Sequence, residues 1–322
     1  MSSEPLLVAD IGGTNARFAL FVREETGPSR IIHKKTLLAE NFAHIADAAH
    51  AYLTSLSGTP PTRAAFAVAG PTGSEDFQFT NSPWSFNRAA LSAALNLSDL
   101  QIVNDFEAQA LGVLHLPQDA LSTLKKGTVN STAPIAVLGP GTGLGLSLLV
   151  GDNNDARVNA RAIATEGGHM AFAPRTDKEI EVLQFIEREL DYVSYEDLLS
   201  GRGLVNIHRA LCALSSTASV ELTPSKITEA ALEKTSPIAQ QTVEMFCAIL
   251  GSFTGDIILA CGAKGGVYIA GGITPRILPI LHESEFEKRL TSRGSISAYV
   301  NNVPITVVMS DEAAFWGAAS LL

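Results

Sequence analysis

Two stretches of the chain share one pattern, an apolar run, a Gly-Thr turn and a second apolar run. They are PLLVADIGGTNARFALF at 5–21 and PIAVLGPGTGLGLSLLV at 134–150. Each predicts a β-hairpin that opens a domain, because β-branched runs favour strands and glycine favours tight turns. The two turns lie about 130 residues apart, which is close to one domain length. We therefore expect a duplicated α/β architecture that binds its ligand between the two halves.

The rest of the chain fits an alternation of strands and helices. Short apolar runs predict strands, and apolar residues repeated every three or four positions predict helices. The polar stretch around 213–225 predicts a surface loop. The expected strands are 64–70, 100–105 and 305–310. The expected helices are 41–56, 81–97 (mostly after Pro83), 106–114, 177–190, 236–262 and 311–322, and 265–281 is expected to form a strand, a glycine turn and a helix.

Charge and composition exclude several classes of protein. The 322 residues include 33 acidic and 23 basic side chains, a formal charge of −10, without a basic stripe, so we expect no nucleic-acid partner. An acidic protein must build any phosphate site locally, from backbone amides or a metal. No apolar run approaches the about 18 residues of a membrane span. The start lacks a signal-peptide pattern, and the three widely spaced cysteines predict no disulfide framework, so we expect a cytoplasmic protein without membrane partners.

The first glycine turn follows Asp10 and consists of Gly12, Gly13 and Thr14. Glycines at a hairpin tip leave backbone N–H groups accessible, and such groups bind phosphate oxygens. Asp10, at the end of the strand, can hold Mg²⁺ directly or through water. An ordinary hairpin turn explains the same residues. We expect Arg17 to be structural and to face out of the returning strand.

The second glycine turn, LGPGTGLG at 138–145, contains Gly141, Thr142 and Gly143. A dinucleotide fingerprint would need a glycine where Leu144 stands, and would continue into a helix, whereas the residues that follow predict a strand. No P-loop sequence is present. Two Gly-Thr turns facing each other remain consistent with a nucleotide clamp.

Polar residues at two further places are candidates for chemistry. Asp105, beside Asn104, lies where a strand is expected to end and a helix to begin, which suits either an N-cap or a base that accepts a hydroxyl proton. Glu166 and His169 flank two glycines and can both contact one polyhydroxylated ligand. A zinc site is not expected there, because no further ligands lie at suitable spacing.

Two other motifs are ambiguous by themselves. Glu196, in YEDLLSG, fits a capped helix with exposed acids, and Ser194 with Asp197 resembles a capping box. Gly271 and Gly272, between a strand and a Pro-started helix, fit either a tight turn or space for a purine.

Seven motifs, taken in order along nearly the whole chain, resemble the bacterial glucokinase family, which is related to hexokinases. The motif Asp-x-Gly-Gly-Thr alone occurs in many sugar kinases and ATPases, whereas the ordered combination is specific. The motifs are VADIGGTNARFAL, TNSPWSF, IVNDFEAQA, LGPGTGLG, EGGHMAFAP, SYEDLLSGRGLVN and YIAGGITPR.

The resemblance implies an α/β, two-domain actin-like ATPase (ribonuclease H-like) fold with a ligand cleft between the domains. The small domain would comprise 1–110 and the C-terminal helix 310–322, and the large domain 111–309. The implied reaction transfers the γ-phosphoryl group of ATP to the 6-hydroxyl of D-glucose, with Mg²⁺ as cofactor, and yields glucose 6-phosphate and ADP. The family also suggests a homodimer.

The resemblance carries roles to individual residues, with Asp105 as the catalytic base. Arg202 departs from the pattern, because other members can have a smaller or apolar residue there, and no role follows for it. The related repressor/kinase family has a cysteine-rich zinc loop that is absent here, which favours the zinc-free branch. The implied nucleotide-binding residues are Asp10, Gly12, Gly13, Thr14, Gly141, Thr142, Gly143, Gly271 and Gly272, and the implied glucose-binding residues are Asn104, Asp105, Glu166, His169 and Glu196.

Three alternatives remain from the sequence. A kinase of another hexose, such as mannose or an amino sugar, fits the same motifs, because that distinction depends on pocket shape. A sugar-sensing regulator would need a DNA-binding segment, whereas the first strand is expected to begin by Pro5. An actin-like structural ATPase would leave the pairs Asn104–Asp105 and Glu166–His169 unexplained.

Overall fold

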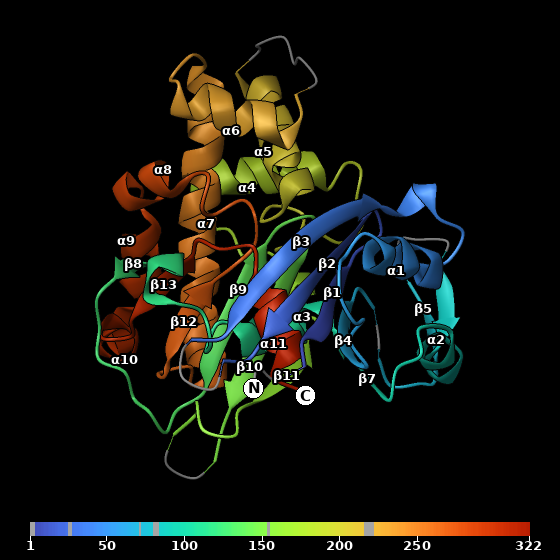
Figure 1. Ribbon diagram of the computed structural model, residues 1–322. Helices are drawn as coiled ribbons and strands as arrows, with labels where there is room; N and C mark the ends of the chain where they lie inside the picture. The colour runs from blue at the N-terminus through green and yellow to red at the C-terminus, as the bar shows by residue number, and fades with distance from the viewer. Residues whose placement is uncertain (1–3, 25–27, 71, 80–83, 153–154, 216–221) are drawn as a thin grey trace. The chain divides into compact units, whose positions relative to one another are not determined.

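A computed structural model describes the chain except for residues 1–3, 25–27, 71, 80–83, 153–154 and 216–221. The chain splits into two compact units (Figure 1). Unit 1 comprises Met1–Gln118 and Ser310–Leu322, and unit 2 comprises Asp119–Met309. The division therefore falls after Gln118 and not after residue 110 as expected. The reason is helix α3 (Asp105–Gly112), which crosses the expected boundary and packs along helix α11 (Ala313–Ala319) in unit 1.

Unit 1 is built on a five-stranded sheet in the order β3-β2-β1-β4-β7. The neighbours β1–β2 and β2–β3 are antiparallel, whereas β1, β4 and β7 run parallel. The strands are β1 (Leu6–Ile11), β2 (Asn15–Val22), β3 (Arg30–Leu38), β4 (Arg63–Val68) and β7 (Asp99–Asn104), beside a two-stranded sheet of β5 (Asp76–Gln78) and β6 (Ser85–Asn87) and the helices η1 (Ala39–Asn41), α1 (Ile45–Thr54), α2 (Arg88–Ala94), α3 and α11.

The sheet of unit 1 is covered on both faces, which explains why β1 is buried along almost its whole length. On one face Phe18 stacks on Tyr52 of α1, with ring centroids 5.4 Å apart. On the other face α11 packs on the sheet through Phe315 and its alanines. Close approach of α11 to α3 requires glycine, because a Cβ on Gly112 would meet the backbone of Ala313.

Unit 2 repeats this order in its own six-stranded sheet, β11-β10-β9-β12-β13-β8. As in unit 1, an antiparallel hairpin comes first and two strands parallel to its first strand follow on the other side, with β8 as an extra antiparallel edge. The hairpins predicted at 5–21 and 134–150 are thus confirmed as β1–β2 and β9–β10. The strands are β8 (Leu121–Lys125), β9 (Ile135–Pro140), β10 (Leu144–Val150), β11 (Arg161–Thr165), β12 (Gly266–Ile269) and β13 (Ile305–Val308).

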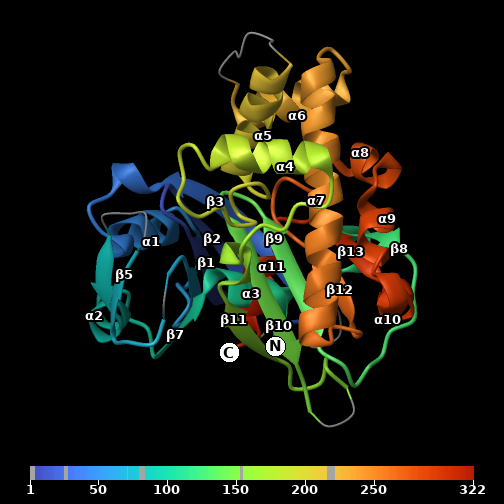
Figure 2. The ribbon, with the colours of Figure 1, turned by 180° about the vertical axis from the view of Figure 1, so that it is seen from behind.

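Helix α7 (Pro237–Cys261) is the central helix of unit 2 and lies along the sheet (Figure 2). The Ser236 side chain caps its start, and Gly262, with φ +64°, ends it. By length and composition it could cross a membrane, but 72% of its most apolar window is buried within the protein, as in core helices. The other helices are η2 (Gln118–Ala120), η3 (Gly167–His169), η4 (Gly294–Ile296), α4 (Asp177–Ile186), α5 (Gly201–Leu214), α6 (Pro224–Leu232), α8 (Leu278–Glu283), α9 (Phe286–Thr291) and α10 (Ser297–Asn301).

Two expected helices of unit 1 begin about one turn later than the sequence predicts. The helix expected from residue 41 begins at Ile45, because the backbone N–H of His44 donates to the Asp47 carboxylate at 3.0 Å and fixes the first turn there. The helix expected mostly after Pro83 covers only α2, and 85–87 form strand β6 instead. Residues 81–83 of that expectation, and most of the loop expected around 213–225, lie outside the described residues.

Candidate active site

The first glycine turn joins β1 to β2 at the carboxyl end of β1. The Gly12 N–H donates to the Asn15 carbonyl at 2.9 Å and closes the turn. Gly13 has no Cβ and Thr14 is exposed, so within the described residues the N–H groups of these two positions remain available to an anion. The turn therefore has the accessible backbone that phosphate binding needs.

Asp10 lies opposite Arg17 across the β1–β2 pair, and the two side chains form an ion pair. Arg17 was expected to be structural and to face out of the strand; its side chain is partly exposed, and the strand register places it beside Asp10, with which it pairs. Arg17 also donates to the Asp311 carbonyl at 3.2 Å. Asp10 is thus held by one oxygen, Oδ2, and its other oxygen is free of this contact.

Asn104, rather than Asp105, caps helix α3. Its Oδ1 accepts hydrogen bonds from the backbone N–H groups of Phe106 and Glu107, at 3.0 and 3.1 Å. Its Nδ2 donates to the Gly70 carbonyl at 3.2 Å. Asp105 is the first residue of α3, so its carboxylate is released from the capping role and lies at the carboxyl end of β7.

Asp105 has a raised pKa of about 6, against an ordinary value of 3.8. Burial is the main cause, because it disfavours the charged carboxylate, and the negative charge of Asp10 adds to it. The N–H of Phe106 donates to Asp105 Oδ1 at 2.8 Å and acts in the opposite direction. A base whose pKa lies near neutrality suits proton transfer at physiological pH.

The topology of unit 1 brings these groups to one edge of its sheet. Strands β1, β4 and β7 are parallel, and Ile11, Val68 and Asn104 occupy neighbouring positions in the pairing register. The glycine turn follows Ile11 directly, and Asp105 follows Asn104. Carboxyl ends of parallel strands are the usual binding edge of α/β sheets.

The second glycine turn has the same construction in unit 2. The Gly141 N–H donates to the Gly143 carbonyl at 2.8 Å, and Thr142 is exposed at the tip. The Gly141 carbonyl accepts from the Gly201 N–H at 2.8 Å, which ties the turn to the start of α5.

Glu196 lies directly against this turn. Its Oε2 accepts from the Leu144 N–H at 2.9 Å, and a Cβ on Gly143 would lie only 2.6 Å from the same oxygen. The Glu196 N–H donates to the Gly168 carbonyl at 2.9 Å. The structure therefore brings the predicted nucleotide-binding turn and Glu196, a predicted glucose-binding residue, into contact within unit 2, although they are more than 50 positions apart in the sequence.

His169 and Glu166 lie on and beside η3, next to Glu196. His169 Nε2 is 3.9 Å from Glu196 Oε2, and the His169 side chain is 57% exposed. Glu166 is also exposed, and its carbonyl accepts from the His169 N–H at 3.0 Å. Both side chains are thus accessible to a ligand bound near Glu196.

Sequence reasoning missed the contact between Glu196 and Arg202. Arg202 lies 3.4 Å from Glu196 Oε1 and 3.0 Å from Asp197 Oδ1. Asp197 is buried and not exposed as expected, because its carboxylate accepts from both the N–H and the hydroxyl of Ser194. The spacing of Ser194 and Asp197 signalled that contact, whereas no periodicity links Arg202 to Glu196.

Gly271 and Gly272 follow β12, beside the second glycine turn. Gly271 has φ +81°, and a Cβ there would meet the Pro140 carbonyl at the end of β9. Gly272 has nothing within 4 Å of where its Cβ would be. One glycine therefore permits close strand packing, and the other leaves open space above the turn.

The residues present fit Mg²⁺ and a nucleotide. Mg²⁺ usually keeps several waters and binds one or two protein carboxylates together with substrate phosphates. Asp10 offers a carboxylate oxygen beside the glycine turn, and a cation there would offset the repulsion between Asp10 and Asp105. No cluster of three or more metal-ligating side chains occurs in the described ranges, and this mode of binding requires none.

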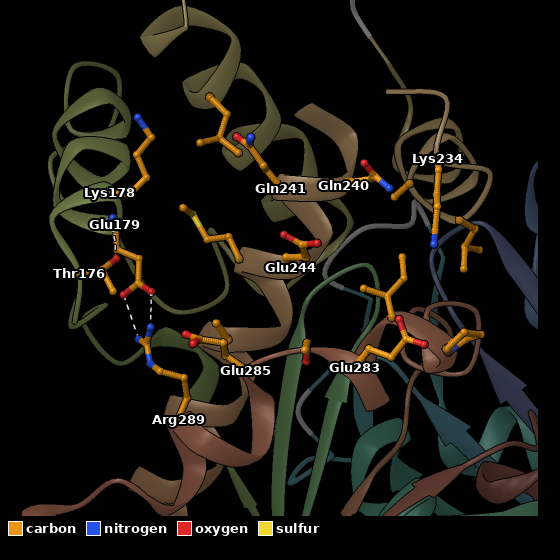
Figure 3. Close-up of a pocket in the computed structure, with 18 residues that line it drawn as sticks. Thr176, Lys178, Glu179, Lys234, Gln240, Gln241, Glu244, Glu283, Glu285 and Arg289 are labelled. Carbon is orange, nitrogen blue, oxygen red and sulfur yellow. Dashed lines mark hydrogen bonds and ion pairs between the residues drawn. The ribbon is translucent and has the colours of Figure 1, made fainter. Parts of the chain in front are cut away.

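A cavity of about 680 Å³ lies elsewhere in unit 2, among helices α4 to α9 (Figure 3). The predicted site residues, all of which the structure describes, are not among those that line it. Arg289 lies at its edge and forms a buried two-point ion pair with Glu179, at 2.6 and 3.0 Å. The predicted site residues therefore lie outside this cavity.

Comparison with known proteins gives one consistent result. A sequence model of the glucokinase family matches residues 7–322. A glucokinase of Neisseria meningitidis is 41% identical over 319 residues, which are 99% of this chain and 94% of the relative. The crystal structure of a glucokinase from an Antarctic psychrotroph is 35% identical, with a TM-score of 0.87 and 99% of each chain covered.

A more distant structure shares the fold. It is a ROK family glucokinase from Streptomyces griseus, in complex with glucose and AMPPNP, with 19% identity, a TM-score of 0.65 and 98% of each chain covered. The family match spans nearly the whole chain, so the predicted resemblance is confirmed. This chain belongs to the glucokinase family, and it is an ATP-dependent hexose kinase, a glucokinase.

Proposed function

We propose that Asp105 is the general base of this glucokinase. It accepts the proton of the glucose 6-hydroxyl while that oxygen forms its bond to the γ-phosphorus of ATP and the bond to the ADP oxygen breaks. The observation that carries this assignment is the carboxylate at the carboxyl end of β7, whose pKa of about 6 suits a base near neutral pH. Phosphoryl transfer otherwise requires positioning and charge neutralisation.

The two glycine turns supply the phosphate contacts in this proposal. Their accessible N–H groups, at Gly13 and Thr14 and at Thr142 and Gly143, bind phosphate oxygens without any net positive charge on the protein. Asp10 holds Mg²⁺, which neutralises charge on the transferring phosphate when bound. Gly271 and Gly272 leave room for the adenosine. The ROK glucokinase that resembles this chain was crystallised with both glucose and a nucleotide, which supports a shared binding mode.

The sugar is bound by hydrogen bonds to its hydroxyls. Glu196, His169 and Glu166 supply acceptors and donors in unit 2, and Asn104 and Asp105 supply them in unit 1. Asn104 has its Oδ1 occupied by the cap of α3, so it contacts the sugar through its Nδ2 group. We expect D-glucose as the preferred sugar, with mannose and amino sugars as the competing substrates.

The repeated strand order of the two sheets supports the actin-like ATPase fold. In both units a hairpin is followed by two parallel strands on the far side of its first strand, with a glycine turn at the hairpin tip. This repetition is expected if the units arose by duplication.

Sugar-dependent ADP release from Mg²⁺–ATP tests the proposal. The wild type should release ADP with glucose and release less with mannose or glucosamine at equal concentration. Asp105→Asn should lower kcat at least about 10²-fold, the usual contribution of a positioned base. Glu166→Gln and His169→Ala should raise the glucose KM, because they leave hydroxyls without partners. An Asp105→Asn enzyme with normal turnover would exclude Asp105 as the base.

A further inference from the structure

Arg202, to which the family resemblance assigns no role, contacts two acids. It stands at the second position of α5, and its Nη2 lies 3.0 Å from Asp197 Oδ1 and 3.4 Å from Glu196 Oε1. Asp197 is fixed, because its other oxygen accepts two hydrogen bonds from Ser194. Asp197 therefore anchors the guanidinium beside Glu196.

Charge, and not packing, holds the Arg202 guanidinium in this place. The side chain is 62% exposed and borders a cavity of about 340 Å³, which Val205 and Asn206 also line. Because open space adjoins the side chain, other rotamers are sterically available to it. Its observed position depends on attraction to the two carboxylates.

Glu196 is in turn held at both of its oxygens. Leu144 donates its N–H to Oε2, and Arg202 approaches Oε1. Each carboxylate oxygen can accept more than one hydrogen bond, so acceptor positions remain for a ligand. Fixing both oxygens gives those positions a constant direction, which lowers the entropic cost of binding hydroxyls.

We propose that Arg202 is a positioning residue for Glu196 and sets the affinity for the sugar without touching it. This inference rests on the proposed function, in which Glu196 binds sugar hydroxyls. Arg202 approaches Oε1 of Glu196, whereas the glycine turn is bound to Oε2, so we expect the nucleotide affinity and the chemical step not to depend on Arg202.

The first test compares Arg202→Met, Arg202→Lys and a matched control, Arg209→Met. Arg209 lies on the same helix and pairs with Glu189 at 2.6 Å, and neither residue belongs to the proposed sugar-binding set. Arg202→Met should raise the glucose KM about two- to five-fold, the range for an exposed ion pair. In Arg202→Met, kcat and the KM for ATP should not change. Arg202→Lys should recover part of the glucose affinity, and Arg209→Met should have the glucose KM of the wild type.

The second test uses monodeoxy sugars that lack the hydroxyl at C1, C2, C3 or C4. Glu196→Gln identifies the hydroxyl that Glu196 binds, because the substitution should cost nothing further on the sugar that lacks it. Arg202→Met should lose its effect on that same sugar. A purely structural role of Arg202 would weaken the binding of all four sugars equally.

The outcomes separate the two proposals. An unchanged glucose KM in Arg202→Met, beside a raised KM in Glu196→Gln, overturns the role of Arg202 and leaves the sugar site intact. A raised ATP KM in Arg202→Met also overturns it, since Arg202 would then serve the phosphates. An unchanged glucose KM in Glu196→Gln removes Glu196 from the proposed sugar site, and the inference with it.

Discussion

Replacing Asp105 with asparagine should stabilise unit 1 at neutral and alkaline pH while it abolishes most of the activity. The pKa of Asp105 is raised from 3.8 to about 6, so the folded state disfavours its charge. Such a group contributes stability that is fully present below about pH 3.8 and is lost as the pH rises through about 6. An asparagine side chain has no charge to bury, so the variant avoids this loss.

The size of the effect follows from the shift. About two pKa units correspond to about 3 kcal/mol in the free energy of unfolding once the pH exceeds 7. At pH 4.5 the same linkage leaves about 1 kcal/mol. The advantage of Asp105→Asn over the wild type should therefore grow by about 2 kcal/mol between these pH values, whatever constant offset the amide itself introduces.

The assay is urea unfolding followed by tryptophan fluorescence. The chain has two tryptophans, Trp84 and Trp316, and both lie in unit 1. The signal therefore reports the unit that contains Asp105. A stability difference that stays constant from pH 4.5 to pH 8 would refute the argument that burial raises the pKa of Asp105. In the wild type, kcat should also fall at acid pH, where the proposed base is protonated.

Three further predictions test other contacts. Gly143→Ala should raise the glucose KM in steady-state assays, because the new Cβ would lie 2.6 Å from Glu196 Oε2 and displace the flexible end of that side chain. The circular dichroism spectrum should stay unchanged, and an unchanged glucose KM would contradict the placement of Glu196. Arg289→Met should destabilise unit 2 by about 3–5 kcal/mol in calorimetry, because it leaves the buried Glu179 charge unpaired. Its neighbour Lys288→Met breaks only an exposed pair with Glu285 and should cost less than about 1 kcal/mol, so equal losses would refute this reasoning. In urea unfolding without Mg²⁺, Arg17→Met should shift to higher pH the range in which stability falls with rising pH, because an unpaired Asp10 carboxylate would raise the pKa of Asp105 further; a range that stays in place or moves to lower pH would refute this coupling.

Local patterns were sufficient to predict the hairpins, because their strands and turns are set by neighbouring residues. The cap of α3 shows the limit of that reasoning. Asn104 and Asp105 are both good N-cap residues, and only the exact end of β7 decides that Asn104 takes the cap. That one-residue difference leaves the Asp105 carboxylate outside the cap, as its proposed role as a base requires.

Contacts between distant segments were not predictable in the same way. The pairing of Asp10 with Arg17 depends on strand register, and a shift of one residue would place Arg17 on the other face. The contact of Glu196 with the Leu144 N–H depends on how η3 and the start of α5 pack against the second glycine turn. Neither arrangement leaves a periodic trace in the sequence.

The position of α11 has a consequence for synthesis on the ribosome. This helix covers one face of the sheet in unit 1, yet its residues are translated after the whole of unit 2. During translation, Val8, Phe21 and Ala65 of the sheet therefore lack their cover by α11 until Asp119–Met309 have been synthesised. A stalled or prematurely terminated chain would expose this apolar face, and we expect chaperones to bind the incomplete chain there.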